Sequence, residues 1–280
     1  MKNLTIAIVD TAYHTLASRA IDKAVEVTGA DSVLVLSDRD FYPGSTFVKI
    51  DTITTKLEYS NLMLKELGKH ATKDFMMTIQ YDGIPTDPTK WQPEFLNYDY
   101  IGAPWPWFPE NYRVGNGGFS LRSKRLTDNC LDDYVQFRPG AEEYQEDVHI
   151  GVLYKDWLSS KGVTYAPVSL ASKFSAETPG GKFDTYGFHG TLCLPFYLDD
   201  NYLSFYISNL TEKMLTGDAH IRILYGLFRA ERYEHVEHYM DHAVSINPNF
   251  KQVLLDQFPG DTIHYPGMTL EDIEQLLINY

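Results

Sequence analysis

The first 37 residues place a strand, an amphipathic helix and a second strand in succession. Residues 4–9 and 32–36 are apolar and rich in β-branched side chains, which is typical of buried strands. Between them apolar pairs recur at helical spacing, and Gly29 marks the expected end of the helix. A strand, a helix and a strand in this order form a βαβ unit, in which the two strands are parallel. The chain is therefore predicted to be an α/β protein with an at least partly parallel sheet.

Further elements continue this alternation. Residues 46–50, 75–80 and 163–166 are predicted strands because short apolar runs occur there. A helix is predicted over residues 56–69, with three leucines on one face, and another over residues 147–160.

Polar side chains directly follow the early predicted strands. Ligands of open α/β sheets bind at the carboxyl ends of the strands, so these side chains are expected along one edge. They are Asp10, Thr11, Ser37, Asp38 and Asp82. The sequence has no GxGxxG after the first strand and no GxxxxGK[ST], which disfavours a standard dinucleotide site and excludes a P-loop ATPase.

The pattern changes near residue 200, where it becomes helical. Residues 218–230 and 232–246 resemble a single tetratricopeptide-like hairpin, and one such hairpin cannot bury its own apolar face. We therefore expect a main domain over residues 1–200 and a helical extension over residues 201–280 that packs on it as a cap. A protein-binding module is the alternative for the extension.

Charge and cysteine content restrict the function classes. The 24 Lys+Arg and 38 Asp+Glu residues give a net charge of −14, which disfavours broad nucleic-acid binding. Two cysteines cannot form a disulfide scaffold or a cysteine-based zinc site. The sequence shows no signal peptide and no apolar run of the roughly 18 residues that span a bilayer, so a cytoplasmic location is expected.

Two stretches near strand ends combine residues that could bind a ligand. In Gln80-Tyr-Asp-Gly83 the carboxylate of Asp82 could hold a divalent metal and, through it, a diphosphate, although Asp-Gly is also a common turn. In residues 114–123 (VGNGGFSLRS) three glycines surround Asn116 and allow the backbone to approach a ligand closely. A flexible hairpin is the alternative.

Two later stretches carry titratable groups. Glu146 and Asp147 begin a predicted helix, where acidic residues either complement the helix dipole or supply a general base. His189 lies in residues 187–190 (GFHG), where it could reach a metal or a phosphate, although a lone histidine is more often structural.

Taken in order, these stretches resemble a family of GT-A-type sugar transferases. The resemblance is carried by residues 80–83 (QYDG), 95–105 (FLNYDYIGAPW), 115–123 (GNGGFSLRS), 146–148 (EDV) and 188–190 (FHG). It covers about residues 4–190 and implies a GT-A-like fold, that is, a Rossmann-like mixed sheet flanked by helices. It also implies a glycosyltransferase that moves a hexosyl or pentosyl group from a nucleotide-diphosphate donor, expected to be a UDP-sugar, to an acceptor hydroxyl with inversion.

The resemblance further implies roles for individual residues. Mn²⁺ or Mg²⁺ would bind at Asp82, with His189 completing the site, and Gln80 replaces the first carboxylate of the family's DxD motif. Asp147, beside Glu146, matches the aspartate that acts as the base in inverting members. The implied donor-binding residues are Asp10, Thr11, Asp38, Lys56, Asn61, Gln80, Asp82, Gly117 and Gly118.

Aromatic side chains gather between Trp91 and Tyr112, a stretch that contains every tryptophan except Trp157. Rings with an apolar face and a polar handle are suited to hydroxyl-rich ligands. A hydrophobic plug under a long loop is the alternative for each ring. The expected acceptor-binding residues are Trp105, Trp107, Tyr112 and Asn116.

Three functions remain open. The first is the transferase, acting on a glycan, a protein or another hydroxyl acceptor. The second is a catalytically silent carbohydrate- or protein-binding module, suggested by Gln80. The third is the same enzyme class with a modified DNA base as acceptor, gripped by aromatic residues and the basic residues 122–125, which the net charge of −14 disfavours.

Overall fold

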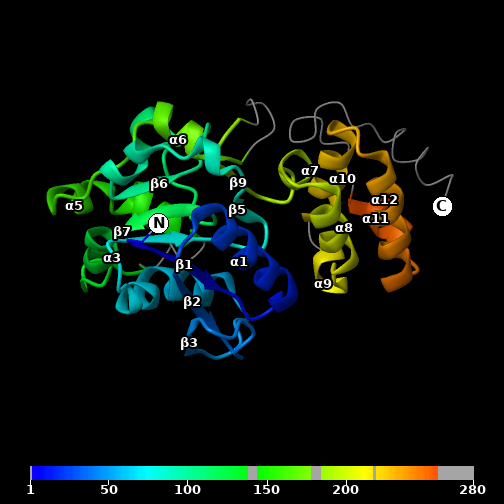
Figure 1. Cartoon of the computed structure of the whole chain (residues 1–280), viewed down its shortest axis with the longest axis horizontal. Coiled ribbons are helices and arrows are strands. Elements are labelled where there is room, and N and C mark those ends of the chain that lie inside the picture. Colours follow the sequence, from blue (N-terminus) through cyan, green and yellow to red (C-terminus); the bar gives the residue numbers. More distant parts are fainter. Residues whose placement is uncertain (1, 138–143, 178–183, 217–218, 258–280) are drawn as a thin grey trace. The chain divides into compact units, whose positions relative to one another are not determined.

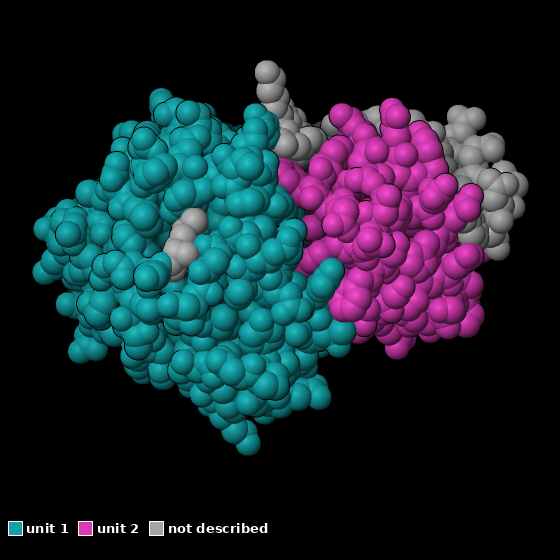
Figure 2. Space-filling model, in the orientation of Figure 1, with its two compact units in different colours: residues 1–177, 181–189 teal, residues 178–180, 190–280 magenta. Residues whose placement is uncertain are grey.

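The computed structural model describes residues 2–137, 144–177, 184–216 and 219–257. The chain divides into two compact units, one made by residues up to His189 and the other by residues from Gly190 onward (Figure 2). The expected packing of residues 201–280 on a domain of residues 1–200 stays a prediction.

A six-stranded mixed sheet forms the centre of the first unit (Figure 1). Its strands, in spatial order, are β3 (Thr46–Lys49), β2 (Ser32–Ser37), β1 (Leu4–Val9), β4 (Phe75–Thr78), β7 (Ser120–Ser123) and β6 (Tyr100–Gly102). The first four pair in parallel, whereas β7 runs antiparallel to both β4 and β6. The predicted α/β class with a Rossmann-like mixed sheet is confirmed.

A smaller sheet of three strands brings distant motifs together. Its order is β5 (Gly83–Pro85), β9 (Gly187–His189) and β8 (Ser175–Ala176). The antiparallel pairing of β5 with β9 sets Gly83 opposite His189. The stretch that ends β4 and the stretch that contains His189 are therefore neighbours in the fold.

Two helices of the first unit have capping residues at their ends. Gly29 ends α1 in the left-handed region, with φ of 62°, which a glycine adopts without a steric penalty. A capping box starts α2, because Thr55 Oγ1 accepts the N–H of Glu58 while Glu58 Oε2 accepts the N–H of Thr55. The α-helices are α1 (His14–Thr28), α2 (Lys56–Asn61), α3 (Lys124–Cys130), α4 (Glu146–Val148), α5 (Lys155–Ser160) and α6 (Val168–Phe174). The π-helical turns are Leu62–Glu66 and His149–Leu153, and the 3₁₀ turns are Leu67–His70, Pro88–Lys90, Pro93–Asn97 and Glu110–Tyr112.

Two apolar clusters support the sheet. One joins β1, β2 and β4 to the helical segment after α2, through residues such as Leu36, Met63 and Leu67. The other packs Leu126 of α3 and Leu158 of α5 around Tyr100. Burial of these side chains fixes the strands whose ends carry the polar residues.

The second unit is helical. Its helices are α7 (Leu194–Tyr197), α8 (Asp200–Ser208), α9 (Glu212–Leu215), α10 (Ala219–Arg229), α11 (Tyr233–Ile246) and α12 (Phe250–Gln257). The imidazoles of His235 and His238 on α11 reach the hydroxyls of Ser204 and Ser208 on α8, with N–O distances of 3.3 and 3.1 Å. Helices α10 and α11 confirm the predicted hairpin. Within the described residues, every helix is too short or too polar to cross a bilayer.

One expectation about local structure is confirmed with a change of helix type, and another was wrong. The helix expected over residues 56–69 is α-helical only to Asn61 and continues as a π-helical turn and a 3₁₀ turn. The wider turn shifts the phase of the helix, so Leu57 is 37% exposed although Leu64 and Leu67 are buried. The expected strand at residues 163–166 forms only an isolated bridge between Tyr165 and Tyr100.

Candidate active site

Three polar residues lie at the carboxyl ends of β1 and β2, which are adjacent strands. Asp10 Oδ1 accepts the N–H groups of Ala12 and Tyr13 at 2.8 and 2.6 Å, and burial raises the pKa of the Asp10 carboxyl. Thr11 Oγ1 accepts the N–H of Ile53 at 2.9 Å. The predicted donor residues Asp10 and Thr11 therefore also hold the backbone of this edge in place.

Asp38, at the end of β2, pairs with a histidine of α1. His14 Nε2 lies 2.9 Å from Asp38 Oδ1, and Thr52 Oγ1 donates to Asp38 Oδ2 at 3.2 Å. Partial desolvation acts to raise the pKa of Asp38, but the hydrogen bonds from His14 and Thr52 outweigh it and lower the pKa below its ordinary value. Asp38 is thus held as a carboxylate.

The reversed direction of β7 places the glycine-rich loop at the same edge. Because β7 is antiparallel to β4, its first residue, Ser120, lies opposite Thr78 at the end of β4. Thr78 Oγ1 and Ser120 Oγ are 2.7 Å apart, and Thr78 Oγ1 also donates to the carbonyl of Gly117 at 2.9 Å. The loop before β7 is therefore fixed beside Gln80 and Asp82, which follow β4.

His189 connects this loop to the end of β4. Its Nε2 lies 3.0 Å from Gln80 Oε1, and its Nδ1 lies 3.5 Å from Glu177 Oε1. Glu177 Oε1 also accepts the side-chain N–H of Asn116 at 2.7 Å, and Gln80 Nε2 donates to the Tyr59 hydroxyl at 2.5 Å. Both imidazole nitrogens therefore face oxygen atoms.

The surroundings of His189 favour its cationic form. Burial acts to lower the pKa of His189, but the carboxylates of Glu177, Asp82 and Asp147 outweigh it and raise the pKa to about 9. The carboxylate of Asp82 is thus close enough to His189 to affect the pKa of its imidazole. These two residues are the predicted metal ligands.

Asp147 is a buried carboxylate beside the loop. It is 5% exposed, and its Oδ2 and Oδ1 accept the N–H groups of Gly117 and Val148 at 2.9 and 2.8 Å. Burial, with the negative charge of Glu146 next to it, raises the pKa of Asp147 to about 7. A carboxylate with a pKa near neutrality is suited to general-base chemistry.

Glu146 has a different role from its neighbour. Its Oε1 accepts from Arg122 NH2 at 2.9 Å, and both side chains are almost fully buried. The same guanidinium nitrogen donates to the carbonyl of Gly117 at 3.3 Å. Glu146 therefore forms a buried ion pair with Arg122, which in turn holds the carbonyl of Gly117 in the loop.

Two glycines allow the side chains to come this close. A Cβ on Gly117 would lie 2.3 Å from Glu146 Oε1, and a Cβ on Gly118 would lie 2.1 Å from His189 Nε2. Any larger residue would push these groups away. Glycine is thus required at both positions because the side chains of Glu146 and His189 approach the backbone so closely.

The site has some of the features that a divalent cation needs. Within the described residues no three His, Cys, Asp or Glu side chains converge as a metal site. Mg²⁺ is commonly held by one or two protein ligands together with substrate phosphates and water. Asp82 and neutral His189, with the Gln80 oxygen nearby, fit such a site, provided that His189 gives up the proton favoured in this state.

The predicted acceptor residues have different positions. Trp105 is 3% exposed, and its ring fills the space where a Cβ of Gly115 would lie, as expected of a plug. Trp107 is 62% exposed. Asn116 is buried and joins the Glu177 carboxylate, whereas Tyr112 is half-buried and lines a cleft.

The structure gathers most, but not all, of the predicted residues. Lys56 and Asn61 are exposed at the two ends of α2, and no bond connects their side chains to the cluster within the described part of the chain. Tyr59, which lies between them, reaches Gln80 instead. Tyr59 and Glu177 were not predicted because each owes its position to contacts between distant segments.

Comparisons with known proteins add a family and several likenesses in fold. A family model described as a protein of unknown function (DUF5672) matches residues 45–189, more than half of the chain. A comparison with curated proteins found no match.

Several solved structures are similar to this chain at low sequence identity. A glycosyltransferase involved in the glycosylation of the major capsid of PBCV-1 is 10% identical, with 66% of this chain and 91% of that chain covered and a TM-score of 0.43. The galactosyltransferase LgtC, in complex with donor and acceptor sugar analogs, is 15% identical, with 66% and 86% covered and a TM-score of 0.43. The mannosyltransferase PcManGT from Pyrobaculum calidifontis, in complex with GDP-Man and Mn²⁺, is 9% identical, with 99% and 79% covered and a TM-score of 0.40.

Proposed function

The chain belongs to the DUF5672 family, and from its Asp82, His189 and Asp147 we propose that it is a glycosyltransferase with a nucleotide-sugar donor. It moves a hexosyl or pentosyl group to a hydroxyl of a glycan, a protein or another acceptor, with inversion at the anomeric carbon. The observation that carries the proposal is Asp147, a buried carboxylate of raised pKa held beside a glycine-rich loop. We also propose a cytoplasmic location, since Cys130 and Cys193 are both buried thiols.

The donor would lie along the carboxyl ends of β1, β2 and β4. Asp10, Thr11 and Asp38 present oxygen atoms at the first two strand ends, which suits the hydroxyls and base of a uridine. Asp82 and His189 lie near the third, on the side of the Gly117–Gly118 loop. With the nucleoside at the ends of β1 and β2, the diphosphate would lie between the nucleoside and the Gly117–Gly118 loop.

Neutralising the departing diphosphate is the next requirement. Asp82 and His189 would hold Mn²⁺ or Mg²⁺, which, when bound, offsets the charge of a diphosphate. Without that ion, the imidazolium of His189 is itself a cation at this place. The glycine-rich loop, whose Gly117 and Gly118 N–H groups are held by Asp147 and by Asn116 Oδ1, would form a fixed wall that helps to orient the sugar.

Asp147 would take the proton of the acceptor hydroxyl. Its anchoring by the Gly117 N–H fixes the carboxylate, and its raised pKa makes it a stronger base than an exposed aspartate. As Asp147 takes the proton, the hydroxyl oxygen would bond to the anomeric carbon on the face opposite the departing nucleoside diphosphate, whose bond to that carbon breaks. This single displacement would invert the configuration.

The proposal is tested by UDP release from a panel of UDP-sugars, with Mn²⁺ and with chelator, and with glycan, peptide and hydroxymethylated DNA acceptors. Asp82→Ala is expected to abolish metal-dependent donor binding. Asp147→Asn is expected to keep donor binding and to lower transfer by about 10²-fold or more.

Asp133→Asn is the matched control, because it removes an exposed carboxylate away from the cluster. It should leave donor binding and transfer unchanged. Absence of UDP binding, hydrolysis and transfer across the whole panel contradicts the proposal, and transfer that survives in Asp147→Asn removes Asp147 as the base.

A binding module without turnover is the second candidate. Gln80 occupies the place of a carboxylate, and its Oε1 engages the imidazole nitrogen that a metal would need. Calorimetry that shows glycan binding indifferent to Mn²⁺ and UDP, in a protein that releases no UDP, would favour this candidate.

A further inference from the structure

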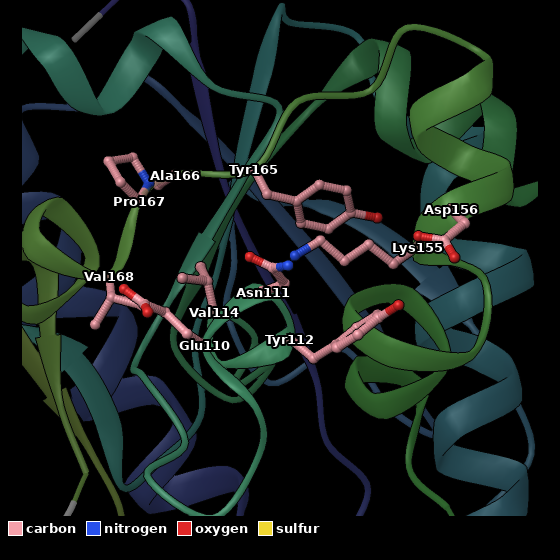
Figure 3. Close-up of a pocket in the computed structure, with 10 residues that line it drawn as sticks. All are labelled: Glu110, Asn111, Tyr112, Val114, Lys155, Asp156, Tyr165, Ala166, Pro167 and Val168. Carbon is pink, nitrogen blue, oxygen red and sulfur yellow. The ribbon is translucent and has the colours of Figure 1, made fainter.

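A cleft of about 470 Å³ opens beside the glycine-rich loop (Figure 3). Its walls come from residues 110–114, from the start of α5 and from residues 165–168. Val114 lines the cleft, and the chain reaches Gly117, which holds Asp147, three residues later. The cleft therefore lies at the start of the glycine-rich stretch that holds Asp147.

Lys155 extends into this cleft between two tyrosine rings, as Figure 3 shows. Its Nζ lies 4.8 Å from the centre of the Tyr165 ring and 5.3 Å from the centre of the Tyr112 ring. The Tyr165 hydroxyl donates to the carbonyl of Ile150 at 2.8 Å, which fixes that ring. The ammonium is thus held in place by rings on two segments.

The ammonium has unused hydrogen-bonding capacity. Lys155 is half-buried, and burial lowers the pKa of its amine, although the nearby Asp156 acts in the opposite direction. The rings offset part of the lost hydration but accept no strong N–H bond. Across the described residues, neither a hydrogen bond nor an ion pair engages the three donors of Lys155.

The rest of the lining indicates what kind of anion would fit. Glu110, Asn111 and Asp156 also line the cleft, and their oxygens suit the hydroxyls of a sugar. The two carboxylates disfavour a highly charged ligand. A sugar with a single anionic group meets both conditions, since its anion pairs with Lys155 and its hydroxyls face the polar walls.

We propose that this cleft binds an acceptor sugar that carries a carboxylate or a phosphate, with Lys155 as the residue that recognises the anion. Tyr112 and Tyr165 hold the ammonium and provide flat faces for the sugar ring. The identity of the sugar as acceptor rests on the proposed function, whereas its binding to the cleft does not.

The test is a calorimetric titration of the full chain, without donor or metal, with methyl glucuronide, glucose 6-phosphate and methyl glucoside. The two anionic sugars are expected to bind more tightly than the neutral one. Lys155→Met should weaken them about tenfold or more, since it removes a charge-assisted hydrogen bond. Lys155→Arg, which keeps the charge, should recover most of the affinity.

Lys161→Met is the matched control, because Lys161 also lies over an aromatic ring, that of Trp157 at 5.1 Å, but outside the cleft. It should leave the binding of the anionic sugars unchanged, and thermal unfolding should show that all variants are folded. Equal affinity for the three sugars, or an equal loss in both Met variants, overturns the proposal. Binding of anionic sugars by a chain that releases no UDP would retain the cleft and reject the transferase.

Discussion

At the scale of single residues, the most informative group is the carboxylate of Asp147. Its pKa is raised to about 7, whereas that of an unfolded aspartate is about 3.9. The ionised form needed by a base is therefore populated only as the pH rises through about 7. We expect transfer, measured as kcat/KM from pH 5 to 9, to have a rising limb near pH 7 that Asp133→Asn retains.

The same shift predicts a change in stability with pH. Because the folded state holds this proton more tightly than the unfolded chain, its contribution is complete below about pH 3.9 and is lost as the pH rises through about 7. The unfolding free energy of the wild type should therefore fall relative to that of Asp147→Asn over this window, in urea titrations. A constant difference between the two proteins would show that Asp147 titrates as an exposed group.

Gly118 is the second residue that the structure makes testable. A Cβ there would meet His189 Nε2 at 2.1 Å and Gln80 Oε1 at 2.8 Å, so Gly118→Ala must displace the imidazole. We expect a loss of about 1–3 kcal/mol in unfolding free energy and a larger proportional loss of donor binding. Calorimetry and urea titration measure the two effects.

Gly162→Ala separates crowding from backbone strain. Gly162 has φ of 84° but no atom within 4 Å of its Cβ position, so alanine there strains the backbone away from the site. It should lower stability and leave donor binding intact. If both alanine variants lose donor binding equally, the close approach of His189 to Gly118 does not explain the loss of donor binding in Gly118→Ala.

The sequence indicated Asp82, Asp147 and His189 because short motifs carry them, and the structure brings them to one place. It did not indicate Glu177, Tyr59 or Lys155, whose partners come from distant segments. Arg122 was interpreted as part of a motif and as one of the basic residues that could grip a nucleic-acid strand, but its guanidinium is buried with Glu146. Such roles depend on three-dimensional contacts that no local pattern encodes.

At the scale of elements, α2 connects a helix cap to the site. The helix starts with the capping box of Thr55 and Glu58, and its Tyr59 hydroxyl accepts from Gln80. Thr55→Ala removes the cap and should cost about 1 kcal/mol, with faster amide exchange in residues 56–61. Hydrogen exchange read by NMR measures the change.

Thr55→Ser is the control for this prediction, because serine keeps the capping oxygen. Its exchange should match that of the wild type. If Thr55→Ala exchanges no faster than Thr55→Ser, packing rather than the cap fixes the start of α2.

The elements also show where sequence patterns succeed. The βαβ unit at the start of the chain was predicted because an amphipathic helix between two short apolar runs is typical of such a unit. Strands β1 and β2 and helix α1 confirm the prediction. The antiparallel direction of β7 was not predicted, because a four-residue strand has no pattern that reveals its direction. The aromatic stretch was interpreted as a sugar-facing surface, yet Phe95 packs against Tyr186 in the core and the half-buried Trp91 packs against both.

At the scale of the whole molecule, the two compact units predict a divided response to ligand. A ligand bound along β1, β2 and β4 stabilises the segments that unfold with these strands, by about 2.7 kcal/mol at a hundredfold excess over Kd. Saturating UDP should therefore slow exchange in the buried strands of the first unit and leave α8, α10 and α11 unchanged. Mass spectrometry of peptides after deuterium labelling measures both.

Asp82→Ala with the same UDP concentration is the control, since weaker binding should remove the added protection. Equal slowing in both units of the wild type would show that they unfold as one cooperative body.

The pairing of β9 with β5 has a consequence for how the protein is made. Strands β1 to β4 come from the first 78 residues and can assemble early during synthesis, but His189 is far later in the chain. Until β9 emerges from the ribosome, Asp82 and the glycine-rich loop lack their partner, and a growing chain carries an open sheet edge at β5. Contacts of such long sequence separation form slowly. The polar residues of this site therefore come together only after almost the whole first unit has been synthesised.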